Sequence, residues 1–97
     1  MSRRTIRWTK RALRRLDQVG AHISKDSPAA AAKVVARLVS SVDALADHPA
    51  MGRTGRIAGT RELAFADIPY IIPYRVTRHD IEVLTVMHAA QQWPEEL

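Results

Sequence analysis

The sequence predicts an α+β fold in which a helical hairpin packs on one face of a small antiparallel sheet, with the element order β-α-α-β-β-β. Three observations predict it. A short alternating segment comes first, two segments with helical periodicity follow closely, and three strand-like segments complete the pattern. We expect residues 1–97 to form a single domain with one modest core, because a chain of 97 residues buries only about 60–65% of its unfolded surface.

The first predicted elements are a strand and an amphipathic helix. Residues 5–9, TIRWT, alternate between apolar and polar side chains, which is typical of a short strand. Thr9 can then cap the helix that follows. Apolar residues recur at helical spacing over residues 10–24 and predict a helix there. Gly20 lies inside this pattern, so either two backbones approach closely at that point or the helix ends early.

The second helix has a clear predicted start and end. Ser27 is a favourable cap, and Pro28 fits the first helical position, where a missing N–H costs nothing. An apolar stripe continues from there, and Pro49 is expected to stop the helix near Asp47. Because the link between the two helices is short, they are expected to form an antiparallel hairpin.

The second half of the chain is predicted to supply most of the sheet, from strands at residues 61–65, 69–77 and 81–88. The last of these is apolar on both faces, as a central strand is. Residues 78–80, RHD, read as a tight hairpin connection. Pro73 cannot donate a ladder hydrogen bond, so we expect its nitrogen to face a sheet edge or a bulge. One sheet face, or its rim, should then remain free for a partner.

Composition narrows the function. The net charge is +5 and the sequence pI is near 10.4, which favours an anionic partner, although a simply basic surface has the same composition. The chain has no cysteine, which excludes a disulfide framework and thiol chemistry and fits the cytoplasm. It contains no secretory signal and no apolar segment of the roughly 20 residues that span a bilayer, so no membrane association is expected.

Motifs for metal, cofactor or triad chemistry are absent from the sequence. The four histidines are scattered without metal-ligand spacing, and the glycine-rich segment lacks the ending of a phosphate-binding P-loop. We therefore expect neither metal nor cofactor. His88, near the end of a strand, is the one histidine considered as a catalytic group, and a structural role is the alternative.

The segment HPAMGRTGRIAGTREL, residues 48–63, holds three of the four glycines and interleaves them with arginine. Glycine allows a backbone to approach a partner closely, and arginine offers a planar fork for phosphate or carboxylate. We expect Arg53, Arg56 and Arg61 to contact a partner or target rather than to support folding. The alternatives are that Arg53 or Arg56 holds helix-end carbonyls and that Arg61 pairs with Glu62.

The first helix is the other candidate surface. Its cations recur four residues apart, and like charges at that spacing destabilise an isolated helix by a few tenths of a kcal/mol. Such a cost suggests a face that meets anions, and the candidates are Arg11 and Arg14. A solvated face is the alternative.

Taken in order, several motifs resemble the RelE/ParE toxin family of type II toxin–antitoxin systems. They are W-T before a helix, P-x-A-A opening the second helix, L-A-D-H-P-x-M-G-R-x-G-R, G-T-R-E-L, P-Y-I-I-P-Y-R-V and I-E-V-L-x-V-M-H-x-x-x-x-W-P. The resemblance covers nearly the whole chain and implies the same helical hairpin on a small sheet. It also implies a growth inhibitor neutralised by a cognate antitoxin, with operator DNA bound mostly through that antitoxin. Trp93, in the last motif, joins the arginines as a candidate contact residue.

The family has two branches. RelE-like members are ribosome-dependent mRNA endonucleases, whereas ParE-like members target DNA gyrase and need no hydrolytic site. The endonucleases carry an arginine in a strand of the type Y-R-L-V-Y, where this chain has Ile71. This departure favours the ParE-like branch. Under the endonuclease alternative, the resemblance assigns catalysis to Arg61, Arg75 and His88, and under the favoured reading Arg61 and Arg75 are contact residues.

A third possibility is a non-catalytic, basic nucleic-acid-binding module that uses the first helix. Salt-dependent binding to bare DNA or RNA would support it. The sequence offers few exposed aromatic residues for base stacking, since Trp8 is expected in the core.

Overall fold

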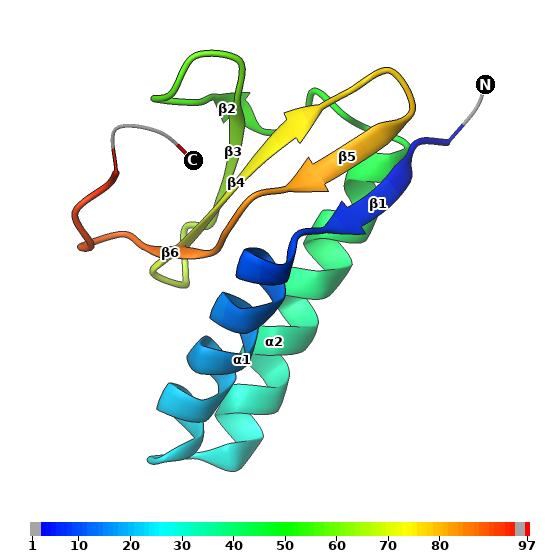
Figure 1. Cartoon of the computed structure of the whole chain (residues 1–97). Helices are drawn as coiled ribbons and strands as arrows, with labels where there is room; N and C mark the ends of the chain where they lie inside the picture. The colour runs from blue at the N-terminus through cyan, green and yellow to red at the C-terminus, as the bar shows by residue number, and fades with distance from the viewer. Residues whose placement is uncertain (1–2, 95–96) are drawn as a thin grey trace.

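A computed structural model describes residues 3–94 and 97. Two long antiparallel helices lie against one side of a twisted sheet and extend beyond its edge (Figure 1). The elements are β1 (Thr5–Trp8), α1 (Lys10–Ser24), α2 (Pro28–Asp43), the 3-10 turn η1 (Ala44–Ala46), β2 (Arg53–Thr54), β3 (Arg61–Ala64), β4 (Tyr70–Val76), β5 (Asp80–Val83) and β6 (Met87–His88). Within the described residues, no helix is both long and apolar enough to cross a membrane.

Both predicted helix starts are confirmed. The Thr9 hydroxyl accepts a hydrogen bond from the Ala12 N–H at 3.0 Å, and the Ser27 hydroxyl accepts one from the Ala30 N–H at 3.1 Å. Gly20 lies inside an unbroken α1, where an added Cβ would be 3.3 Å from Val35 Cγ2 of α2. Its role is therefore the close approach of the two helices.

The sheet has the order β1-β5-β4-β3-β2, and β6 also pairs with β4. The pairs within β2–β3–β4–β5 and the β4–β6 pair are antiparallel, but β1 runs parallel to β5. The sheet is therefore mixed, whereas the sequence pattern suggested an antiparallel one. Alternation identifies each strand, but the relative direction of two strands far apart in the sequence is decided by the connections between them.

The segment predicted as one strand, residues 81–88, is divided into β5 and β6. Tyr74 pairs with Val83 and Ile71 pairs with Met87, so residues 72–73 of β4 lie opposite residues 84–86. The extra residue is a β-bulge. The Leu84 N–H donates to the Pro73 carbonyl at 3.0 Å, which places Pro73 beside this irregularity and confirms that prediction.

The two faces of the sheet differ in chemistry. Tyr70, Ile72 and Tyr74 of β4 belong to the buried core, with side chains of both helices packed in the same cluster. Alternation places Arg75 on the opposite face, where it pairs with Glu82 of β5. We call this second side, away from the helices, the outer face.

Candidate functional site

The glycines of residues 48–63 permit close packing of the chain on itself. An added Cβ at Gly52 would be 2.6 Å from the Tyr74 hydroxyl, and one at Gly55 would overlap the side chain of Thr60. Gly59 has a φ of +78°, a conformation that favours glycine. The glycines were expected to let this backbone approach a partner, but Gly52 and Gly55 let it pack against Tyr74 of β4 and against Thr60.

A buried tyrosine ties this loop to the core. The Tyr74 hydroxyl donates to the Pro49 carbonyl at 2.7 Å and accepts from the Gly52 N–H at 2.9 Å. Arg61 donates to the Gly52 carbonyl at 2.8 Å, so it holds the chain that leaves η1. Burial is the main cause that raises the pKa of Tyr74, against the opposing effects of the Gly52 hydrogen bond and the Arg61 charge.

A buried carboxylate gathers the loop arginines on the outer face. The Glu62 side chain is only 1% exposed and accepts from Arg53 Nη2 at 3.0 Å and from the Arg56 backbone N–H at 2.8 Å. The Arg56 guanidinium also lies 3.5 Å from Glu62 and 3.9 Å from the centre of the Trp93 ring. Arg53 and Arg56 are therefore tied to a buried carboxylate, and their expected contact with a partner stays a prediction for the exposed parts of their side chains. Arg61 donates to the Gly52 carbonyl and not to Glu62, so the alternative pair is not formed.

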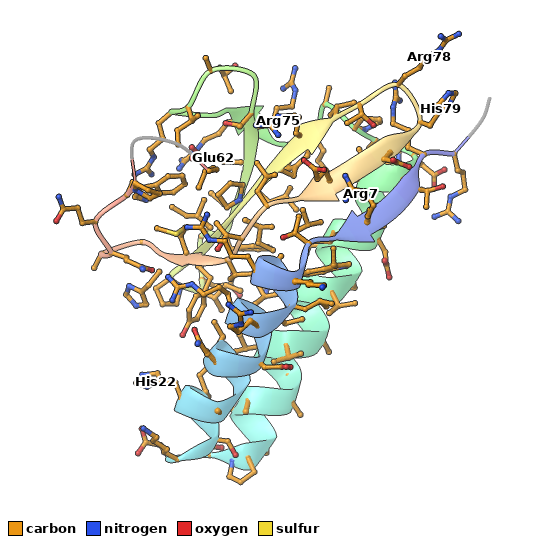
Figure 2. All side chains as sticks on the ribbon, viewed as in Figure 1. Arg7, His22, Glu62, Arg75, Arg78 and His79 are labelled. Carbon is orange, nitrogen blue, oxygen red and sulfur yellow. The ribbon has the colours of Figure 1, made fainter. Side chains whose placement is uncertain are left out.

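A second ion-pair group lies on the same face across β1, β5 and β4. Glu82 accepts from Arg7 on one side and from Arg75 Nη1, at 3.2 Å, on the other. Figure 2 shows Arg7, Arg75 and Glu62 along the sheet, with His22 far from them on α1. On the outer face, two glutamates therefore each engage two arginines, so about half of the positive charge of these four arginines is balanced.

The three residues proposed for catalysis under the endonuclease alternative do not form one site. His88 pairs with Tyr70 across β6 and β4, and their rings meet edge to face at 5.4 Å on the helix side of the sheet. Arg75 is five positions from Tyr70 on the same strand and therefore lies on the outer face. Arg61 is held at the loop carbonyls.

The α1 candidates remain accessible. Arg11 and Arg14 are both exposed, and neither takes part in an ion pair within residues 3–94 and 97. Leu13, on the same helix, is 48% exposed and adds an accessible apolar side chain to α1. A basic surface with an exposed apolar side chain suits an acidic, amphipathic partner segment.

Sequence reasoning missed a pocket between α1 and the end of the sheet. It has a volume of about 250 Å³ and is lined by Arg15, Gln18, Val19, His22, Tyr70, Val86, His88 and Gln91. The signal was present, because Arg11, Arg15, Gln18 and His22 follow one another at spacings of four, three and four residues and so share one stripe of the helix. The candidate site residues named from the sequence included His88 but neither Arg15 nor His22.

Comparison with known proteins places the chain in a family. The family model described as the ParE toxin of type II toxin-antitoxin system, parDE, matches residues 6–93. The chain belongs to the ParE toxin family. It is thus the toxin of a type II toxin–antitoxin system, and its partner is the cognate antitoxin of such a parDE pair.

Two curated relatives are described as toxins. The chain is 69% identical over 97 residues to a putative toxin, Y4kP, of Sinorhizobium fredii, covering 100% of both chains. It is 37% identical over 84 residues to the toxin RelE2 of Caulobacter vibrioides, covering 87% of this chain and 93% of that protein. A solved chromosomal ParDE system from P. aeruginosa contains a chain that matches with a TM-score of 0.78 and 27% identity, over 88% of this chain and 95% of that one. The ParE fold is therefore confirmed.

Proposed function

We propose that this ParE-family toxin inhibits growth by acting on DNA gyrase and has no ribonuclease centre of its own. The observation that carries the proposal is the separation of Arg75 from His88 on opposite faces of the sheet. Family membership identifies the protein as a toxin, and the separation of these two residues favours DNA gyrase over ribosome-bound mRNA as its target.

The chemistry of RNA cleavage explains why the separation matters. A metal-free endonuclease must place a general base, a general acid and a donor to the phosphate around one scissile bond. Here the guanidinium of Arg75 is engaged by Glu82, and that of Arg61 is engaged by loop carbonyls. Ile71, at the position where the endonucleases carry arginine, is buried and supplies no donor. Loss of one such donor alone costs roughly 10²–10³ in rate.

Antitoxin binding is the second part of the proposal. A basic toxin with exposed Arg11 and Arg14 complements an acidic, amphipathic antitoxin segment that folds on contact. Operator DNA is then reached mostly through the antitoxin. The arginines tied to Glu62 contribute to this contact only with the parts of their side chains that stay exposed.

The decisive experiment runs two assays on one preparation of the toxin. Purified gyrase with relaxed plasmid should lose supercoiling activity, and cells that express the toxin should mount a DNA-damage response. Translating ribosomes with a defined message should show no new cuts. Codon-positioned cleavage that is abolished in Arg75→Ala or His88→Ala would overturn the proposal and assign the endonuclease function instead.

A further inference from the structure

The pocket between α1 and β6 has no role in the fold or in the proposed action on gyrase. Its polar lining comes from two directions, with Arg15, Gln18 and His22 on α1 and with His88 and Gln91 at the end of the sheet. At about 250 Å³ it is smaller than the roughly 300–1,000 Å³ of pockets for drug-sized ligands. It therefore suits one small group rather than a whole metabolite.

The hydrogen bonds around the pocket leave mostly donors unused among its lining residues. The oxygen of the Gln18 side-chain amide accepts from Arg15 Nη1 at 3.3 Å, and the oxygen of the Gln91 side-chain amide accepts from the backbone N–H of His88 at 3.3 Å. Each amide thus has its NH₂ group left to donate. His88 Nδ1 accepts from the Ala90 N–H at 3.1 Å, which assigns the ring proton of neutral His88 to Nε2.

One donor in the lining is buried and unsatisfied. Arg15 Nε is inaccessible to solvent and has no hydrogen-bond partner within the described residues. A buried donor without a partner costs about 1–3 kcal/mol, more when the group is charged, so a rotation of the Arg15 side chain that brought Nε to an acceptor in the pocket would be favourable. Among residues 3–94 and 97, no aspartate or glutamate lines this space. An anion from outside the chain would therefore supply a negative charge that this lining lacks.

The arrangement favours a phosphate over a carboxylate. Donors on α1 and on the opposite wall converge from different directions, which matches the tetrahedral oxygens of phosphate better than the two coplanar oxygens of a carboxylate. Arg11 lies exposed on the same helix stripe as Arg15 and adds to the positive field, which favours the more highly charged group.

We propose that the pocket lined by Arg15, His22 and His88 binds a single phosphate group. Two sources carry that group, a free nucleotide and the backbone of a nucleic acid. The exposed Arg11, one helix turn before Arg15, would meet a neighbouring phosphate in the second case. The inference does not depend on gyrase as the target, because it concerns the helix side of the sheet and a ligand that can be tested on the toxin alone.

The test is a titration of the purified toxin followed by NMR of its histidine side chains at constant pH. The probes are inorganic phosphate, adenosine monophosphate, a short DNA duplex and, as the carboxylate probe, acetate. His22 and His88 line the pocket, whereas His48 and His79 do not, so the four rings report binding and its location in one spectrum. Phosphate should shift the first pair selectively and saturably.

Two variants on the same turn of α1, Arg15→Gln and Arg14→Gln, provide a matched comparison of phosphate binding. Arg15→Gln removes the buried donor and should weaken phosphate binding by about tenfold or more. Arg14→Gln removes the same charge from the adjacent, exposed position outside the pocket and should leave binding nearly unchanged. His22→Asn, at an exposed position, serves as a second pocket variant if Arg15→Gln fails to fold.

The outcomes separate cleanly. Binding of adenosine monophosphate at least as tight as inorganic phosphate supports the site with a nucleotide as its source, and duplex binding weakened only by the pocket variants supports it with a nucleic-acid source. Equal losses in Arg14→Gln and Arg15→Gln would overturn the site in favour of a diffuse cationic surface. Acetate binding as tight as phosphate, or the lack of a selective shift at His22 and His88, would also overturn it.

Discussion

Replacing Arg53 with alanine should destabilise the toxin, because it removes donors from a carboxylate that water cannot reach. Glu62 would lose the Arg53 Nε contact at 3.2 Å and the Nη2 contact at 3.0 Å. It would keep the Arg56 backbone N–H at 2.8 Å and the Arg56 guanidinium at 3.5 Å. The carboxylate would then be buried with about half of its partners.

The expected loss follows from this geometry. A hydrogen bond to a charged group contributes about 1.5–3 kcal/mol, and the 53% exposure of the Arg53 side chain places the value near the lower end. A loss of about 1.5–2 kcal/mol lowers the Tm of a domain of this size by about 6–16 °C. An exposed substitution without partners changes stability by less than about 0.5 kcal/mol.

Thermal and urea unfolding of the purified toxin measure this difference. Arg78→Ala is the matched control, since Arg78 is exposed on the turn after β4 and forms no ion pair within residues 3–94 and 97. In a Glu62→Gln background, the effect of Arg53→Ala should shrink, because a neutral amide does not need a cation. Equal Tm values for Arg53→Ala and Arg78→Ala would refute this explanation. It would also be refuted if Arg53→Ala lowered the free energy of unfolding by the same amount in the Glu62→Gln background as in the wild type.

Three further predictions address the loop, the core and the partner. Gly55→Ala should lower the Tm far more than Gly59→Ala, because the new Cβ at position 55 would overlap Thr60. A Cβ at position 59 meets open space and adds only backbone strain of about 1–2 kcal/mol. Similar Tm values for the two variants would contradict this prediction. The free energy of unfolding should fall as pH rises above about 10, because the unfolded chain releases the tyrosine proton before Tyr74 does, and Tyr74→Phe should flatten that slope in urea titrations. The product of the adjacent antitoxin gene should copurify with the toxin and restore growth to cells that express it, and failure of both would be evidence against the pairing.

The elements could be predicted because each had a local cause. Thr9 and Ser27 capped the helices as expected, and the alternation around Tyr74 identified a strand with one core face. Pro73 predicted an edge or a bulge beside it, but the residues of the bulge and the parallel pairing of β1 with β5 could not be predicted, since both depend on register between strands.

The candidate site was harder to predict for a related reason. Arginine beside glycine suggested contact with a partner, but the buried Glu62 that binds Arg53 and Arg56 comes from a neighbouring strand. Alternation could have placed Arg75 and Tyr70 on opposite faces from the sequence alone. The bulge, however, shifts the register of His88 by one position, so its face was known only from the structure.

The pairing of β1 with β5 also constrains when the toxin can fold. Contacts such as that between Arg7 and Glu82 span 75 positions of the chain, whereas α1 and α2 are adjacent in sequence. During synthesis the helical hairpin can assemble early, but the first strand has no neighbour in the sheet until β5 has left the ribosome. A chain truncated before Asp80 would lack a complete sheet, so incomplete translation products should be proteolytically labile and harmless. The sheet of the toxin is therefore completed only after β5 has left the ribosome.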